Sequence, residues 1–283
     1  MTEPTSHQIV INGLTCRYLR WGEDRRPAVL MLHGLRSYAQ TWDTVARALS
    51  GTHAVIAPDF RGRGESSWDP GRDYFTNAYV EDMEKLVASL GLTRFAVIGH
   101  SMGGTVGYAF AARHPDQVSA LVVEDIGPGS STATAGADRI LRELRGTPLG
   151  FDSLAAVRAY WRDTRPGITD DALKSRIEHT VRPAGDGRWE WKLDMAGIAA
   201  ARRSGDPAGP VDLWDCVAAL RCPTLVLRGA RSDFLPVSVC REMADRQPLL
   251  RWAEVPDAGH YAHDDNPAEF LRLVTGFLTG VSP

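Results

Sequence analysis

The sequence predicts an α/β fold built on a mostly parallel, eight-stranded sheet with helices on both faces. Short runs rich in Val, Ile and Leu alternate with longer stretches whose apolar residues have helical spacing, which is typical of a parallel sheet covered by helices. The alternation stops for roughly 90 residues, too long for a structureless loop, and then resumes. We therefore expect a core at 1–126 and 216–283 and a helical cap, inserted into it, at 127–215.

The expected strands are short apolar runs that end at turn residues. The first two, 8–11 and 15–21, flank Asn12-Gly13, a dipeptide that favours a tight hairpin. The other six are short and mostly apolar, as buried strands of a parallel sheet are. They cover 28–32, 54–57, 95–98, 120–123, 224–227 and 252–255.

The expected helices lie between these strands and in the insertion. Residues 78–90 carry an apolar face at helical spacing, and Gly91 follows as a C-terminal stop. Pro267 fits the first turn of the last helix, after Asp265 or Asn266 as cap. The core helices are expected at 41–49, 78–90, 102–113 and 267–278, and the insertion, where no strand is expected, has helices around 138–145, 153–162, 170–180 and 212–219.

Composition narrows the class of protein. The net charge of −3 and the absence of a Lys/Arg block argue against a nucleic-acid partner. The four cysteines have no metal-site spacing and are typical of free thiols in a reducing compartment. The N-terminal residues are polar, and no apolar run approaches the ~20 residues of a membrane span. We expect a cytoplasmic protein with a small-molecule substrate, no membrane contact and no metal or organic cofactor.

Residues 95–104 combine a strand, a G-x-S-x-G turn and a helix start. The sharp turn forces Ser101 into a strained backbone conformation, and Gly99 and Gly103 remove side chains that would collide there. The serine hydroxyl then stands above the sheet, over the N-terminus of a helix that favours negative charge. Ser101 is the predicted nucleophile.

A serine hydroxyl needs a base, and His260 is the predicted one. It follows the last strand, in a loop at the C-terminal edge of the sheet, where open α/β folds bind ligands. His263 is interpreted as a surface group or a support for the site.

The base needs an acid, and two positions compete for that role. Asp233 follows the strand 224–227 and gives the order Ser101, Asp233, His260, which is the favoured interpretation. The alternative is the Glu124-Asp125 pair at the end of the strand before the insertion, with Asp125 as the acid. Asp125 otherwise has a structural role.

Further residues are assigned by their loops. Backbone N–H groups of Leu35 and Met102 are the expected oxyanion hole. Arg36 either holds a substrate carboxylate or is a solvated arginine, and Trp42 belongs to the pocket wall or to the core. The segment 59–66 lacks the ending of a phosphate loop and is interpreted as a structural loop with an Arg–Asp network.

These motifs together resemble the α/β-hydrolase superfamily, in particular its capped serine esterase and lactonase-like branch. The resemblance runs along almost the whole chain. It rests on four motifs: His33-Gly34, the turn at Gly99–Gly104, Gly229 with Asp233 four residues later, and Gly259-His260. It implies that the cap covers the triad and that its aromatic residues line a pocket or pack the cap: Trp161, Trp189, Trp191 and Trp214. Related dehalogenases and epoxide hydrolases have aspartate where Ser101 stands, which argues against both activities.

The expected function is hydrolysis of a carboxylic ester, lactone or thioester through an acyl-enzyme on Ser101. One alternative is a carbon–carbon bond hydrolase acting on a ring-cleavage diketone, with Arg36 as carboxylate reader. Another is a non-hydrolytic enzyme or ligand receptor on the same fold, since fold does not fix function.

Overall fold

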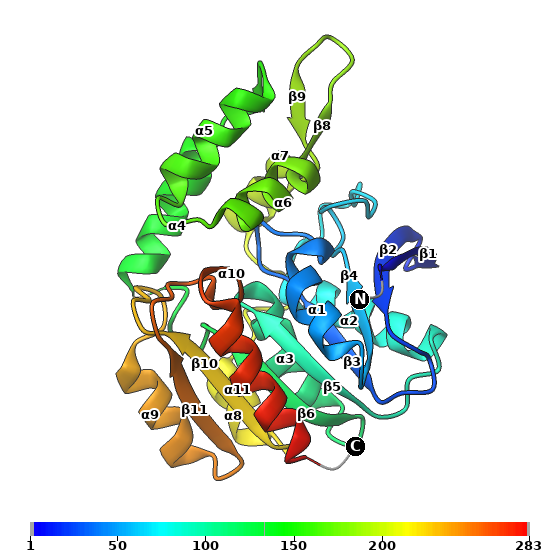
Figure 1. The fold of residues 1–283 in the computed structure, drawn as a ribbon, viewed down its shortest axis with the longest axis vertical. Coiled ribbons are helices and arrows are strands. Elements are labelled where there is room, and N and C mark those ends of the chain that lie inside the picture. Colours follow the sequence, from blue (N-terminus) through cyan, green and yellow to red (C-terminus); the bar gives the residue numbers. More distant parts are fainter. Residues whose placement is uncertain (1–2, 133, 282–283) are drawn as a thin grey trace.

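The computed structural model describes residues 3–132 and 134–281 (Figure 1). Its main sheet has eight strands in the order β1-β2-β4-β3-β5-β6-β10-β11, which confirms the predicted sheet. Only β2 runs antiparallel to its neighbours, and every other adjacent pair is parallel. The strands are β1 (Thr5–Ile11), β2 (Leu14–Trp21), β3 (Ala28–Leu32), β4 (Ala54–Pro58), β5 (Phe95–His100), β6 (Val118–Glu124), β10 (Thr224–Gly229) and β11 (Leu250–Val255).

The opening hairpin turns at the predicted dipeptide. Asn12 and Gly13 have φ of 49° and 76°, the positive values that a two-residue turn between twisted strands requires. The turn pairs Ile11 with Leu14.

Helices cover both faces of the sheet because successive strand residues point to opposite sides. Leu30 and Leu32 pack in the core under α2, α3, α8 and α9, whereas Val29 and Met31 pack under α1 and α11. These helices are α1 (Asp43–Leu49), preceded by a 3₁₀ turn (Ala39–Trp42), α2 (Thr76–Ser89), α3 (Met102–Arg113), α8 (Leu213–Ala219), α9 (Val237–Arg246) and α11 (Pro267–Thr279). The short helix α10 (Ala262–Asp265) follows β11.

The segment between β6 and α8 stands above one end of the sheet in Figure 1. It contains α4 (Ala135–Gly146), α5 (Leu154–Thr164), α6 (Asp170–Thr180) and α7 (Met195–Ser204). The expectation of no strand there is wrong, because β7 (Gly150–Phe151), β8 (Val181–Pro183) and β9 (Trp189–Trp191) form a small sheet. Strands of two or three residues are too short to show a pattern of alternation. We call α4–α7 and this sheet the cap.

The loop 59–66 is a structural network, as predicted. The buried carboxylate of Asp59 accepts hydrogen bonds from the backbone of Ala39 at 2.7 Å and Glu65 at 3.1 Å, and from Arg17 at 3.0 Å. Arg61 donates to both oxygens of Asp82 at 2.6 Å. These bonds fix the loop against β2 and against the 3₁₀ turn that begins at Ala39.

Candidate active site

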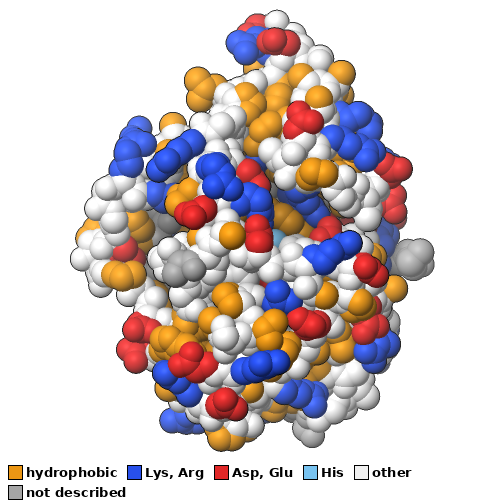
Figure 2. Space-filling view, turned by 90° about the vertical axis from the view of Figure 1, so that its left-hand side faces the viewer, with side chains coloured by type: hydrophobic (Ala, Val, Ile, Leu, Met, Phe, Trp, Pro, Cys, Tyr) orange, Lys and Arg blue, Asp and Glu red, His pale blue; other side chains and the backbone are white. Residues whose placement is uncertain are grey.

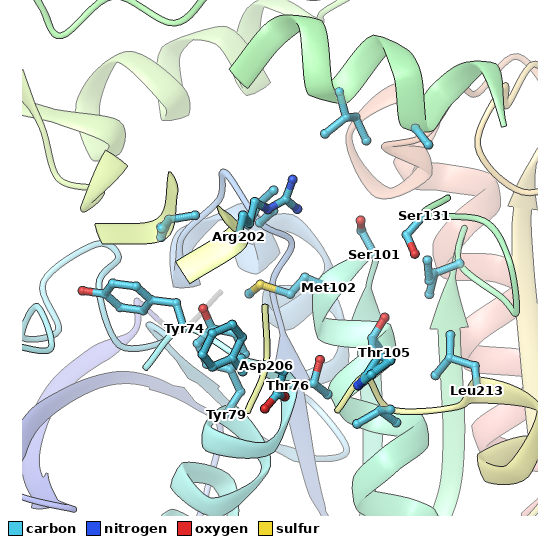
Figure 3. Close-up of a pocket in the computed structure, with 18 of the residues that line it drawn as sticks. Tyr74, Thr76, Tyr79, Ser101, Met102, Thr105, Ser131, Arg202, Asp206 and Leu213 are labelled. Atoms are coloured by element: carbon cyan, nitrogen blue, oxygen red, sulfur yellow. The ribbon is translucent and has the colours of Figure 1, made fainter. Parts of the chain in front are cut away.

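Ser101 occupies the turn between β5 and α3. Its backbone has φ of 51° and ψ of −116°, an arrangement that costs a non-glycine residue of order 1–3 kcal/mol. Two glycines make the turn possible: a Cβ on Gly99 would collide with the Gly103 carbonyl, and a Cβ on Gly103 with the Leu32 carbonyl. The turn places the Ser101 hydroxyl at the start of α3, facing a cavity (Figure 3).

A continuous chain of hydrogen bonds joins Ser101, His260 and Asp125. Nε2 of His260 lies 3.0 Å from Oγ of Ser101, and Nδ1 of His260 lies 2.7 Å from Oδ2 of Asp125. Asp125 also accepts the hydroxyl of Ser232 at 2.6 Å and the N–H of Gly229 at 3.2 Å. All three members of the chain are buried. A carboxylate held in this way keeps the proton on Nδ1 and leaves Nε2 free to accept the serine proton.

Asp233, which we favoured as the acid, does not contact His260, and the alternative Asp125 does. Arg139 of α4 donates to both oxygens of Asp233 at 2.8 Å. This bidentate hydrogen bond lowers the pKa of Asp233, whose side chain is 40% exposed. The loop after β10 places Ser232, and not Asp233, against Asp125. The ion pair of Asp233 with Arg139 instead joins this core loop to α4 of the cap.

Leu35 and Met102, the expected oxyanion donors, lie in the loop after β3 and at the start of α3. Leu35 and Met102 both line the Ser101 cavity, and no acceptor among the described residues takes their N–H groups. Arg63 contacts both residues: its Nε donates to the Leu35 carbonyl at 2.9 Å, and its Nη2 lies 3.5 Å from Sδ of Met102. A fully buried arginine therefore holds the two segments from which the donors come.

Glu124 and His263 form a second buried acid–histidine pair beside the first. Glu124 accepts the His263 backbone N–H at 2.9 Å and lies 2.7 Å from its Nδ1. Nε2 of His263 lies 2.9 Å from Oγ1 of Thr41. Burial alone lowers the pKa of His263, but the carboxylates of Glu124 and Asp264 outweigh burial and raise it. The histidine is thus a buried support of the His260 loop and does not lie on the surface.

His100 fills the space between the two histidines. Its ring centroid lies 4.8 Å from that of His260 and 5.1 Å from that of His263. Its Nε2 lies 2.8 Å from the His260 carbonyl oxygen, the geometry of an N–H donor. Burial and the neighbouring imidazoles hold the pKa of His100 well below its usual value, so it stays neutral.

The cap is bonded to the loop that carries the base. Asp264 accepts from Arg165 at 2.8 Å and from Arg176 of α6 at 3.2 Å. Arg165 also pairs with Asp265 at 2.9 Å and lies over the ring of Tyr261, 4.0 Å from its centroid. These contacts converge within five residues of His260.

A cavity of about 340 Å³ opens in front of Ser101 (Figure 3). Its wall is largely apolar, and the side chains that carry polar groups there are those of Tyr74, Thr76, Tyr79, Ser101, Thr105, Ser131, Arg202 and Asp206. A concave apolar site with a few polar groups is the usual form of a small-molecule pocket. The apolar lining residues include Leu35, Phe75, Ile126, Ile140, Ile198 and Phe234.

Neither expected pocket residue lines this cavity. Arg36 is buried, pairs with Glu143 at 3.1 Å and also bonds Tyr160. Trp42 is fully buried, with its ring 4.6 Å from that of His263 between centroids, so it belongs to the core. Of the tryptophans expected to line a pocket or pack the cap, Trp161, Trp189 and Trp191 pack within the cap, and Trp214 of α8 packs against the core.

The sequence interpretation missed Arg202, the one Lys or Arg side chain in the cavity wall among the described residues. It lies on α7, a helix that was not predicted. Asp194 caps that helix by accepting the Gly197 N–H at 2.8 Å. An aspartate before an alanine-rich run was the signal that could have found it.

Across residues 3–132 and 134–281, no group of three or more His, Cys, Asp and Glu side chains is placed to hold a metal ion. In the same part of the chain, every helix is too short or too polar to span a bilayer.

The chain belongs to the α/β-hydrolase family. The sequence model described as "alpha/beta hydrolase fold" matches residues 27–267. A 3-hydroxybutyrate-oligomer hydrolase of Cupriavidus necator is 33% identical over 274 residues, covering 93% of this chain and 92% of that protein. An esterase of Mycobacterium tuberculosis is 31% identical over 267 residues, covering 92% of this chain and 85% of that protein.

Solved structures show the same fold. The crystal structure of E-2-(acetamidomethylene)succinate hydrolase superimposes with a TM-score of 0.85 at 27% identity, covering 98% of this chain and all of that one. These relatives are hydrolases of several kinds.

Proposed function

We propose that the protein is a serine hydrolase that cleaves a carboxylic ester, lactone or thioester of a small organic substrate. The observation that carries the proposal is the chain of hydrogen bonds from Ser101 through His260 to Asp125. A buried base 3.0 Å from a strained serine hydroxyl, at the wall of a cavity, is the arrangement that activates a nucleophile. Esterase and oligomer-hydrolase relatives support it.

The reaction proceeds in two halves. His260 takes the hydroxyl proton of Ser101 as Oγ attacks the substrate carbonyl, and the N–H groups of Leu35 and Met102 bind the oxyanion. The C–O bond then breaks as His260 returns the proton to the leaving group. Water, deprotonated by His260, attacks the acyl-enzyme and releases the acid and free Ser101. Asp125 stabilises the imidazolium in both halves.

Arg36 as a carboxylate reader would have favoured the alternative of a carbon–carbon hydrolase. Because Arg36 is paired with Glu143 and lies outside the Ser101 cavity wall, that observation no longer supports it. Ester-type cleavage is therefore the function we put forward, and hydrolysis of a diketone by the same triad stays the alternative.

A fluorophosphonate probe tests the proposal directly. We expect an adduct on Ser101 by mass spectrometry, none in Ser101→Ala, and strongly slowed labelling in His260→Gln. A folded wild-type protein that neither reacts with the probe nor cleaves any of a panel of esters, lactones and thioesters would contradict it.

A further inference from the structure

Arg202 stands in the wall between two cavities. It lines the Ser101 cavity and also an adjoining one of about 470 Å³ between α4 and α7. Leu35, Leu141 and Ile198 line both spaces as well, so the two cavities share one wall. Figure 3 shows the guanidinium of Arg202 on the same side of the cavity as Ser101 in that view.

Within residues 3–132 and 134–281, Arg202 makes no hydrogen bond or ion pair with another side chain, as is true of Arg145 and Arg203, whereas three other arginines of the cap and core are paired. Arg36 pairs with Glu143, and Arg139 pairs with both Glu143 and Asp233. Arg63 donates to carbonyl oxygens and to the hydroxyl of Tyr79. Among the residues that the structure describes, no carboxylate or carbonyl accepts a hydrogen bond from Arg202. The side chain is exposed and lines both cavities, so its donors are open to solvent and to a ligand bound there.

The one carboxylate in the wall of the Ser101 cavity, among described residues, belongs to Asp206. Its oxygens are directed to the amide of Asn77 at 3.4 Å and the N–H of Ala208 at 2.9 Å. Figure 3 places Asp206 beside Thr76, away from the guanidinium of Arg202 in that view. Asp206 therefore forms no ion pair with Arg202.

The surroundings of Arg202 are positive as well as apolar. Arg145 and Arg203 line the adjoining cavity. The face drawn in Figure 2 carries Lys and Arg side chains, with Asp and Glu among them, around a hollow in its upper half that also exposes hydrophobic groups. Desolvation, and after it the cation of Arg63, lower the pKa of Arg202, and an anion bound beside the guanidinium would favour its charged form.

We propose that Arg202 is the subsite for a carboxylate group carried by the substrate, so that the esters cleaved at Ser101 are acidic ones. This inference rests on the hydrolase function proposed above. The planar guanidinium binds a carboxylate through two parallel hydrogen bonds, which selects the anion over a neutral group of the same shape. The apolar wall between Arg202 and Ser101 then accommodates the carbon chain that joins carboxylate and ester.

The test compares charged and neutral esters of matched shape. One series is the monoethyl esters of dicarboxylic acids of four to eight carbons, and its neutral counterparts carry an isopropyl group in place of the carboxylate. A second series places the same two groups on the alcohol half of an acetate ester. We expect the wild-type kcat/KM to favour the charged member in at least one series.

Three variants assign that preference to a residue. In Arg202→Gln, the charged-to-neutral ratio of kcat/KM is expected to fall about 10- to 100-fold, the size of a hydrogen bond to a charged group. Arg202→Lys, which keeps a point charge but not the fork, should recover part of the ratio. The control Arg158→Gln removes an equal charge from an exposed cap position that lines neither cavity, and it should keep the ratio.

The two proposals fail in different ways. If Ser101 is labelled and neutral esters are cleaved, but no charged ester is preferred or the ratio survives in Arg202→Gln, the carboxylate subsite is wrong and the hydrolase function stands. If Ser101 is inert, titration calorimetry with glutarate and adipate still tests the subsite: binding by wild type that is lost in Arg202→Gln supports it, and equal or absent binding overturns it.

Discussion

Asp125 and Asp233 follow neighbouring strands, β6 and β10, and matched variants separate their roles. Asp125→Asn replaces an acceptor with an amide that favours the wrong tautomer of His260. We expect kcat to fall by about 10⁴, by analogy with the same change in a serine protease. Asp233→Asn removes an exposed ion pair with Arg139 and should change the free energy of unfolding by at most ~1 kcal/mol.

Ester turnover and the rate of fluorophosphonate labelling measure both variants. Labelling that drops in Asp233→Asn and survives in Asp125→Asn would reverse the assignment drawn from the hydrogen bonds.

The choice between these two acids could not be made from the sequence. Ser101 and His260 are marked by local patterns, a glycine-flanked turn and a loop after the last strand. Both aspartates lie at the same edge of the sheet, and the acid is the one whose side chain points toward His260. Arg139, 94 positions before Asp233, binds that carboxylate, and no local pattern shows such a contact.

His263 gives stability a defined dependence on pH. Glu124 and Asp264 raise its pKa in the folded state above the unfolded value of 6.5, so folding binds a proton between the two values. The stabilisation is fully present below pH 6.5 and is lost as pH rises through the folded pKa. We expect the difference in unfolding free energy between wild type and His263→Asn to shrink between neutral and alkaline pH.

Urea unfolding at several pH values measures this difference. His53 is the control, because burial lowers its pKa, and its contribution is lost in the opposite direction, as pH falls. A His263 difference that grows with pH would contradict the buried ion pair with Glu124.

At the scale of elements, the nucleophile turn depends on close packing of backbone. A Cβ on Gly103 would run into the carbonyl of Leu32 in the neighbouring strand. We expect Gly103→Ala to destabilise the protein by about 1–3 kcal/mol or more, as overpacking of a core does. The labelling of Ser101 should fall with it, because the turn must shift to relieve the collision.

The matched control is Gly276→Ala, in the last turn of α11, where a Cβ meets no atom within 4 Å. There alanine should stabilise by about 0.5–1 kcal/mol through its higher helix propensity. Urea unfolding compares the two. Equal effects of both changes would mean that the turn tolerates a side chain.

Most predicted elements were found where side chains repeat regularly, but the amphipathic helix α9 (Val237–Arg246) was missed despite its apolar face. The buried strands and α2 have clear apolar patterns, and each lies within a few residues of its expected range. Helix α7 was missed because its sequence, from Met195 to Ser204, is mostly small residues without an apolar stripe. Its identity as a helix comes from its cap at Asp194 and its packing, with Ile198 in the core.

In the whole molecule, cap and core meet at α10, next to His260. Asp264 accepts hydrogen bonds from both Arg165 and Arg176, with side-chain exposure of 11%. Burial alone raises the pKa of Asp264, but His263 and the two arginines outweigh it and hold the pKa low. The carboxylate thus stays charged and joins two cap arginines to the loop that carries the base.

Removal of this charge should loosen the cap and the base together. In Asp264→Asn the buried guanidinium of Arg176 loses its carboxylate, and we expect a loss of stability of about 3–5 kcal/mol, as for other broken buried pairs. Hydrogen exchange should accelerate in α5 and α6 more than in the central strands, since the bonds lost are those between cap and core. The value of kcat should fall because the loop of His260 is no longer fixed.

Asp257→Asn is the control for this change. It removes the same charge from the same loop, at a side chain that is 86% exposed and lies 3.9 Å from Arg231. Asparagine also accepts the positive φ of 57° at that position. Exchange in α5 and α6 that is unchanged by Asp264→Asn, or changed equally by Asp257→Asn, would show that the cap is held by its apolar contacts and not by the ion pairs at α10.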